Sequence, residues 1–275
     1  MYNKYKVLAL GLAITVASCQ NKNKETKTAA TSADSISTQA PENLTYKVVG
    51  TLPHDTAAYT EGFELHDGKI YEGTGTYENS FISVSDTSSG KLEKKFPLKD
   101  KSIYGEGISI LGNQLFQLTY QNHVAYVYDL KDLTKPTGTF KWPQEGWGMT
   151  NDGKNLYVSV GSSIIYKLDP KSFTVIGQIQ VTDNLGTVDQ LNELEYADGF
   201  LYINQWQTTK ILKVDVSSGK VVGTIDCFGL LSNYAPNYTP KSDDSVLNGI
   251  AWDKTHQLLY VTGKNWPLIF KLKLD

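Results

Sequence analysis

The sequence predicts an all-β fold, a five-bladed β-propeller with four antiparallel strands per blade. An apolar-aromatic pair marks one strand of every unit, and its aromatic residue recurs at Tyr71, Phe116, Tyr157, Tyr202 and Tyr260. Successive markers are 45, 41, 45 and 58 residues apart. A period of about 40 to 50 residues with several short strands per unit is typical of propeller blades. The alternative, a sandwich or an open meander, requires no fixed period.

The four strands of a blade can be followed in order along the chain. First strands open at 59–63, 104–108, 146–149, 191–194 and 247–252. The marker strands come second, and an Asp-Gly hairpin signal precedes them at 67–68, 152–153 and 198–199. Third strands alternate apolar and polar residues and end in Asp, at 81–86, 125–129, 165–169 and 211–215. Fourth strands follow a turn, as at 91–98 and 220–225.

The last unit stops at Asp275 after only three strands. The segment 44–52 has strand composition and no blade of its own. We therefore expect it to pair with the last blade and close the ring, which leaves no open sheet edge at the joint.

The first residues predict export and a lipid anchor. Lys4 and Lys6 precede an apolar run, 7–17, that is too short to span a bilayer, so residues 1–18 fit a signal peptide. The run ends in Val-Ala-Ser-Cys, which resembles the bacterial lipoprotein box and marks Cys19 for lipidation; an ordinary signal with a chance cysteine is the alternative. We expect residues 19–42 to form a flexible tether and residues 43–275 to form the propeller. We expect a bacterial membrane anchor, periplasmic or at the cell surface.

Charge, cysteine and histidine content limit the partners. The net charge of −3, from 26 basic and 29 acidic residues, shows no long runs and argues against nucleic acid. Cys227 is the only cysteine after Cys19, so we expect it to be a buried thiol without a disulfide partner. The four histidines have no metal-ligand spacing, which argues against a histidine-bound zinc. We expect a monomer that requires no cofactor; a structural cation in the channel is left open.

The candidate site lies where the innermost strands begin, because the loops that enter them converge on one face of a propeller. Glycine and apolar residues suffice there for close approach of the backbones. Several openings carry polar or aromatic residues instead: Tyr59, Glu61, Tyr104, Glu106, Trp147, Asn192, Glu193, Glu195 and Asn248. Each acid or amide alone is equally suited to binding water or backbone amides, but together they indicate a site.

Further candidates follow the second strands, which end on the same face. They are Tyr120, Trp206, Lys264 and Trp266. With Trp147 and the two tyrosines, these rings predict an aromatic box around a small ligand, in which Lys264 and Glu106 are the charged groups.

The same strings resemble the plant and bacterial glutaminyl-peptide cyclotransferases, the papaya-type glutamine cyclases. The resemblance extends from about residue 44 to the C-terminus, and its most specific strings are 192–196 and 247–252. It implies a propeller acyltransferase that converts the N-terminal glutamine of a peptide into pyroglutamate and releases ammonia. It also implies Glu106 as the proton-shuttling glutamate and, as pocket residues, Tyr59, Tyr104, Tyr120, Trp147, Asn192, Trp206 and Lys264.

Four positions depart from the papaya-type pattern. Tyr59, Tyr104 and Tyr120 stand in place of Phe, Phe and Trp, which keeps the box aromatic. Glu61 stands in place of Gln, which adds a carboxylate and leaves the division of roles between Glu61 and Glu106 open.

The residue set suits the implied chemistry. Cyclisation needs a carboxylate to move a proton, donors for an oxyanion, and walls that hold the folded side chain. Glu106 can supply the first if its surroundings raise its pKa, and the aromatic rings can supply the walls. The expected oxyanion donors are Asn192, Lys264 and the indole N–H of Trp147 or Trp206. Glu61 is placed to meet the ammonium group of an arriving peptide.

Two other functions fit the sequence. A calcium-dependent propeller lactonase or hydrolase would coordinate its metal through oxygen ligands such as those of Glu61, Glu106, Asn192 and Asn248. A non-catalytic surface propeller that binds peptides or glycans would use the same residue types.

Overall fold

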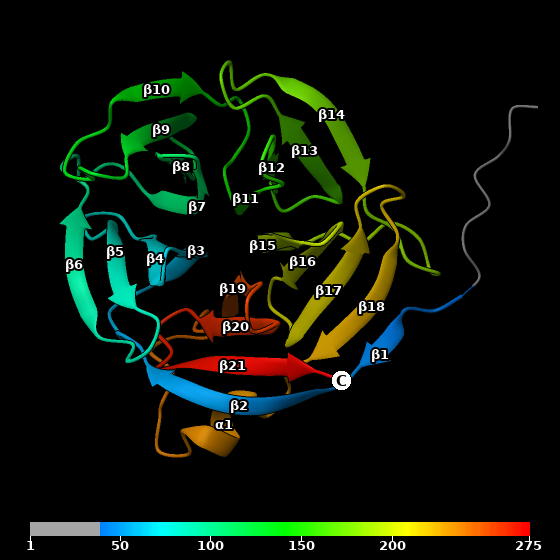
Figure 1. Cartoon of the computed structure of the whole chain (residues 1–275). Helices are drawn as coiled ribbons and strands as arrows, with labels where there is room; N and C mark the ends of the chain where they lie inside the picture. The colour runs from blue at the N-terminus through cyan, green and yellow to red at the C-terminus, as the bar shows by residue number, and fades with distance from the viewer. Residues whose placement is uncertain (1–38) are drawn as a thin grey trace, which may run out of the picture. The chain divides into compact units, whose positions relative to one another are not determined.

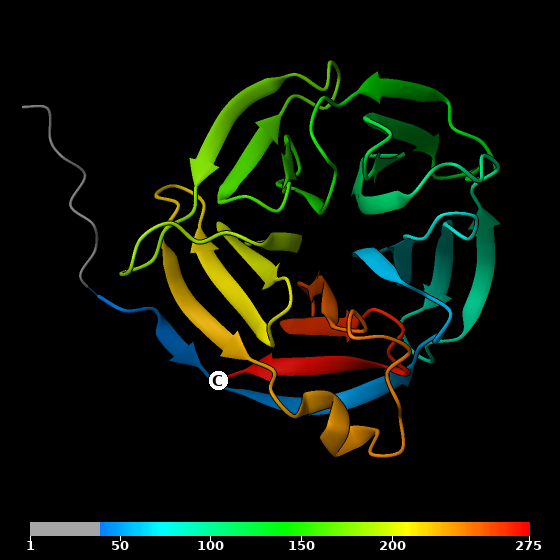
Figure 2. The same cartoon turned by 180° about the vertical axis from the view of Figure 1, so that it is seen from behind.

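The computed structural model of the protein describes residues 39–275. The predicted signal peptide, the lipidation site Cys19 and nearly all of the predicted tether lie outside these residues. Five sheets surround a common axis (Figures 1 and 2), and the predicted five-bladed propeller is confirmed. No helix between residues 39 and 275 is long and apolar enough to cross a membrane.

In the first four blades, four strands follow chain order from an inner strand near the axis to an outer strand toward the rim (Figure 1). The first blade contains β3 (Thr60–His66), β4 (Lys69–Thr74), β5 (Phe81–Asp86) and β6 (Leu92–Pro97). The second contains β7 (Gly105–Leu111), β8 (Gln114–Thr119), β9 (Val124–Asp129) and β10 (Gly138–Lys141). The third contains β11 (Met149–Asn151), β12 (Leu156–Val158), β13 (Ile164–Leu168) and β14 (Val175–Gln180).

The last two blades follow the same plan with additions from the N-terminal segment. The fourth contains β15 (Leu191–Ala197), β16 (Phe200–Gln205), β17 (Lys210–Asp215) and β18 (Val221–Asp226). The fifth contains β19 (Leu247–Asp253), β20 (Leu258–Gly263) and β21 (Leu268–Leu274). A long segment between β18 and β19 carries the short helix α1 (Leu230–Tyr234). Buried apolar side chains fill the space between neighbouring blades.

The N-terminal segment closes the ring, as predicted, but it serves two blades. Strand β2 (Tyr46–Pro53) pairs antiparallel with β21 and supplies the missing outer strand of the fifth blade. Strand β1 (Glu42–Leu44) instead pairs in parallel with β18 of the fourth blade, which the sequence did not predict. The two strands separate at Thr45, whose hydroxyl donates to the Asp275 carboxylate over 2.8 Å. The segment therefore joins the last two blades to each other.

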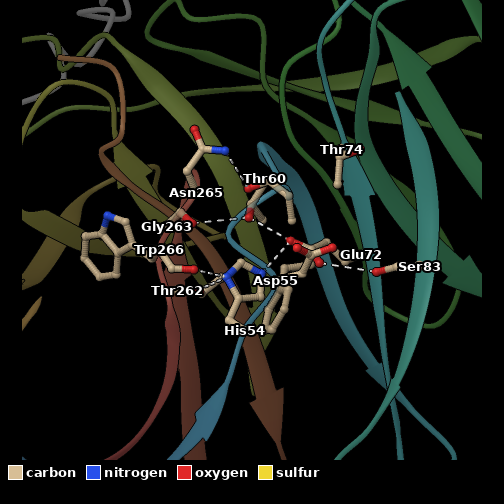
Figure 3. A network of polar contacts seen from close by, with 12 residues as sticks. His54, Asp55, Thr60, Glu72, Thr74, Ser83, Thr262, Gly263, Asn265 and Trp266 are labelled. Carbon is tan, nitrogen blue, oxygen red and sulfur yellow. Dashed lines mark hydrogen bonds and ion pairs between the residues drawn. The ribbon is translucent and has the colours of Figure 1, made fainter. Parts of the chain in front are cut away.

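A buried polar network reinforces this closure (Figure 3). His54 follows β2, and its Nδ1 lies 2.7 Å from the carbonyl oxygen of Trp266 in the fifth blade. Its Nε2 lies 2.9 Å from Oε1 of Glu72 in the first blade. Glu72 also accepts hydrogen bonds from Thr60 at 2.7 Å and Ser83 at 3.3 Å. The His54 side chain thus connects the first and last blades across the joint of the ring.

The inner strands approach one another closely at glycines. A Cβ atom at Gly62 would lie 2.3 Å from the backbone nitrogen of Ile108 in the next blade, and one at Gly148 would lie 2.5 Å from the Asn192 carbonyl oxygen. A side chain at either position would therefore collide with backbone, as expected for inner strands that crowd the axis.

Glutamates on the inner strands link different blades. Glu193 accepts the backbone N–H groups of Phe63 at 3.2 Å and Ile250 at 2.7 Å. Glu195 accepts that of Trp252 at 3.1 Å, and Glu64 accepts that of Ile110 at 2.7 Å. These carboxyl groups satisfy backbone donors on the inner strands of other blades.

Candidate active site

The predicted site residues converge on one cavity of about 190 Å³ on the face where the inner strands begin. Every blade contributes to its lining. The predicted residues that line it are Tyr59, Glu61, Tyr104, Glu106, Tyr120, Trp147, Asn192, Trp206 and Lys264. These residues lie near the start of an inner strand or directly after the end of a second strand. The two strands pair antiparallel, so both positions lie on the same face of the propeller.

A buried ion pair forms one side of the cavity. Lys264 Nζ donates to Glu61 Oε1 over 2.9 Å, and the two side chains are 6% and 3% exposed. Glu61 also accepts hydrogen bonds from the Tyr104 hydroxyl at 3.3 Å and the Asn248 amide at 3.2 Å. Burial lowers the pKa of Lys264, but the Glu61 carboxylate outweighs this effect and the net shift is upward. Lys264 therefore stays charged in the presence of Glu61.

Glu106 differs from Glu61 in lacking hydrogen-bond partners. Its carboxyl group is buried and faces the cavity, and it accepts no hydrogen bond from another side chain or backbone N–H within residues 39–275. Burial raises the pKa of Glu106 well above its ordinary value, the charge of Glu61 raises it further, and Lys264 opposes the shift. A raised pKa brings the protonated form of this carboxyl group within easier reach, as a residue that takes up and releases a proton requires.

Aromatic rings form the remaining walls. The rings of Trp147 and Trp206 meet edge to face, with centroids 5.6 Å apart and an angle of 82°. On the other side, Tyr104 packs against Tyr120 at 5.7 Å and against Tyr77 at 5.2 Å. Such contacts hold each ring in place and give the cavity a defined shape.

The indole N–H groups are already engaged. Trp147 Nε1 donates to Glu145 Oε2 over 3.2 Å, and Trp206 Nε1 donates to Asp244 Oδ1 over 3.0 Å. The sequence suggested both indoles as donors to an oxyanion. Each indole has a single N–H, and in both residues it already donates to a carboxylate, so neither is free for this role. Asn192 and Lys264 remain, and the Asn192 amide has no hydrogen-bond partner in the described part of the chain.

Trp266 does not line this cavity. Lys264 takes the cavity position, and Asn265, with a φ of 62°, turns the chain so that the next side chain faces away. The Trp266 indole packs edge to face against Phe270 and donates to the Ser245 carbonyl oxygen over 3.0 Å. Glu193, Glu195 and Asn248, which also appeared among the polar openings, bind backbone groups or Glu61 instead.

Two lining residues, Tyr77 and Asp244, were not predicted. Tyr77 lies three residues after the end of β4, whereas Tyr120 and Trp206 come directly after their second strands, so the repeat carried no signal for it. Asp244 lies in the segment between β18 and β19, which matches no repeat position. Its carboxylate accepts hydrogen bonds from the Tyr59 hydroxyl and from the Trp206 and Gln207 side chains. No group of three or more His, Cys, Asp or Glu side chains within residues 39–275 is arranged to hold a metal ion.

Comparison with known proteins agrees with this arrangement. The sequence model of the family described as glutamine cyclotransferase matches residues 13–274. The chain belongs to the glutamine cyclotransferase family. It is 36% identical over 232 residues to a glutaminyl-peptide cyclotransferase of Arabidopsis thaliana, and the alignment covers 83% of this chain and 71% of that protein. The crystal structure of Myxococcus xanthus glutaminyl cyclase matches with a TM-score of 0.78 at 30% identity, covering 86% of this chain and 98% of that one. The family resemblance stated from the sequence is confirmed.

Proposed function

We propose that this protein is a glutaminyl-peptide cyclotransferase that converts the N-terminal glutamine of a peptide into pyroglutamate and releases ammonia. The observation that carries the proposal is Glu106, a buried carboxyl group with a raised pKa and no protein hydrogen-bond partner among the described residues, in a cavity walled by aromatic rings. Membership in the glutamine cyclotransferase family supports the same reaction.

The reaction requires one proton to move between two nitrogen atoms. The neutral α-amine of the substrate attacks the Cδ atom of its own side chain, and a C–N bond forms as the carbonyl oxygen becomes negative. Glu106 accepts a proton from the attacking nitrogen and donates it to the carboxamide nitrogen. The bond from Cδ to that nitrogen then breaks, ammonia leaves, and the five-membered lactam remains. Glu106 ends in its starting state, so no covalent intermediate with the enzyme is needed.

The other cavity residues orient the substrate and stabilise the oxyanion. Asn192 and Lys264 line the cavity and donate hydrogen bonds to the oxyanion. The rings of Trp147, Trp206 and Tyr104 hold the substrate side chain near its attack geometry. Glu61 holds Lys264 in place rather than shuttling the proton, since it already has three hydrogen-bond partners and Glu106 has none among residues 39–275.

A direct assay tests the proposal. The full chain is incubated with a Gln-initiated dipeptide and ammonia release is measured, with Glu106→Gln as the test variant. Glu93→Gln, on the outer strand of the first blade, serves as the control. We expect release by the wild type and the control and a loss of about 10²- to 10⁴-fold in Glu106→Gln. No release by the wild type would contradict the function, and equal release by Glu106→Gln would contradict the role of Glu106.

We also propose that the chain is exported, lipidated on Cys19 and anchored as a monomer to a bacterial membrane. The basic start, the short apolar run and the Val-Ala-Ser-Cys string support this. In membrane fractionation, wild type should sediment with membranes and Cys19→Ala should lose this association. Mass spectrometry should find a lipid-modified Cys19 as the first residue, and light scattering in detergent should give the mass of one chain. Unmodified protein with residues 1–18 retained would contradict the anchor.

A further inference from the structure

We propose that a second cavity, beside the candidate active site, binds an apolar side chain of the substrate peptide downstream of its N-terminal glutamine. The inference rests on the proposed function. The cavity has a volume of about 670 Å³ and lies between the segment that carries α1 and the fourth and fifth blades. Its apolar lining includes Phe228, Leu231, Pro236, Val246, Leu247 and Trp266.

The two cavities share one wall. Trp206 lines the first cavity and its neighbour Gln207 lines the second. Likewise, Asp244 lines the first cavity and its neighbour Ser245 lines the second. A single carboxylate oxygen, Asp244 Oδ1, accepts hydrogen bonds from both Trp206 Nε1 at 3.0 Å and Gln207 Nε2 at 2.7 Å. The cavities are therefore separated by about one layer of side chains.

Both cavities open on the same face of the propeller. The segment between β18 and β19 leads into the inner strand β19, and inner strands begin on the face of the candidate active site. Figure 2 shows this segment, with α1, passing from the outer strand of the fourth blade toward the inner strand of the fifth. The edge of the shared wall reaches solvent, because Gln207 is exposed and the Asp244 side chain is 33% exposed. A chain that leaves the first cavity can cross the wall at this edge.

A peptide is the occupant that fits these features. The first cavity, at about 190 Å³, is too small for a whole peptide, so the chain that follows the N-terminal glutamine must leave it. An extended chain advances about 3.3 Å per residue, and Trp206 of the shared wall itself lines the first cavity, so residues that closely follow the glutamine are the ones that can cross the wall. Beyond the wall, the apolar lining and Phe228, which is 81% exposed, offer contact area to an apolar side chain.

Substrate comparison on the full-length wild type tests the inference. Gln-Gly-Gly-Gly is compared with peptides that carry leucine at the second or third position, and glutamine amide measures the basal reaction. We expect leucine at one of these positions to raise kcat/KM about tenfold, since burial of this side chain contributes that much to affinity. Equal kcat/KM for all peptides would overturn the inference while leaving the proposed function intact. No release from any peptide or from glutamine amide would instead overturn the proposed function.

A variant that fills the second cavity gives an independent measurement. Ala235→Trp places an indole at its lining, and Val175→Trp places one on the outer strand of the third blade as the matched control. We expect Ala235→Trp to abolish the advantage of the leucine peptide and to leave turnover of glutamine amide unchanged. Retention of the full leucine advantage would overturn the inference. If Ala235→Trp fails to fold by circular dichroism, Ser232→Phe fills the same cavity from α1.

Discussion

Lys264 Nζ lies 2.9 Å from Glu61 Oε1, in an ion pair formed by residues 203 positions apart in the chain. The pair joins the inner strand of the first blade to the end of the second strand in the fifth. It leaves Glu106 as the carboxyl group of the cavity that has no hydrogen bond from residues 39–275. The division of roles between the two glutamates, open from the sequence, is thus resolved in our proposal by which of them the lysine contacts.

Removal of the Lys264 side chain should destabilise the fold, because the Glu61 carboxylate is then buried without a counterion. We expect Lys264→Met to lower the free energy of unfolding by about 3 kcal/mol, because Glu61 is left buried without its counterion. The double variant Lys264→Met/Glu61→Gln should recover most of this stability but not activity. Urea unfolding measures the first effect and ammonia release the second. A single variant as stable as the wild type would contradict the prediction.

The pH dependence of turnover should report the pKa of Glu106. Burial and the charge of Glu61 raise that pKa, and the shuttle must begin deprotonated to accept a proton from the amine. Activity should therefore be lost as the pH falls through a value above the ordinary glutamate pKa of about 4.3.

Glu61→Gln should move this acid limb of the profile to lower pH. The substitution removes a negative neighbour of Glu106 and leaves the charge of Lys264, which lowers the pKa of Glu106, without its counterion. The profile of kcat against pH measures the shift. An acid limb that stays in place or moves upward would count against the assignment of Glu106.

Stability should depend on pH through His54. Burial lowers the pKa of His54, but Glu72 and the Trp266 carbonyl outweigh it, and the net shift is upward. The contribution of the ion pair is therefore complete below the ordinary histidine pKa of about 6.5 and is lost as the pH rises through the folded-state value. We expect His54→Gln to cost about 3 kcal/mol below pH 6 and progressively less at high pH.

His66→Gln is the matched control for this experiment. His66 is partly exposed and contacts the exposed Asp67 carboxylate at 3.4 Å, so its replacement should change stability by less than about 1 kcal/mol. Unfolding in urea across the pH range measures both variants. A cost of His54→Gln that grows as the pH rises would contradict the expected sign.

The close approach of inner strands should make Gly148 intolerant of a side chain. A Cβ atom there would lie 2.5 Å from the Asn192 carbonyl oxygen, and backbone cannot yield as a flexible side chain can. We expect Gly148→Ala to destabilise the fold by about 2 kcal/mol and to lower kcat, because Asn192 lines the cavity. Gly138→Ala, which has no atom within 4 Å of its added Cβ, should be nearly neutral in thermal unfolding and in turnover. Equal effects of the two substitutions would contradict the packing argument.

The repeat allowed most of the fold to be predicted. A fixed period sets the blades, and the position of a residue within its repeat sets the face on which it lies. Tyr59, Glu106 and Trp147 could be assigned to one cavity for this reason. The rule did not cover Tyr77, because the position equivalent to Tyr120 and Trp206 in the first blade is Gly75 and Tyr77 lies two residues further along the loop. The division of the N-terminal segment between β1 and β2 had no such signal, since both pieces have strand composition.

By itself the sequence determined the five blades, the strand that closes the ring, the family and most of the side chains that reach the cavity, because these follow from local patterns repeated along the chain. Only the tertiary structure decided which groups meet. Contacts between distant segments decide that Lys264 pairs with Glu61 and that Trp266 points away from the cavity. A connection outside the repeat places Asp244 in the cavity wall. The physical reason is that hydrogen bonds and ion pairs are set by distances in space, which a periodic pattern fixes for strands but not for the loops between them.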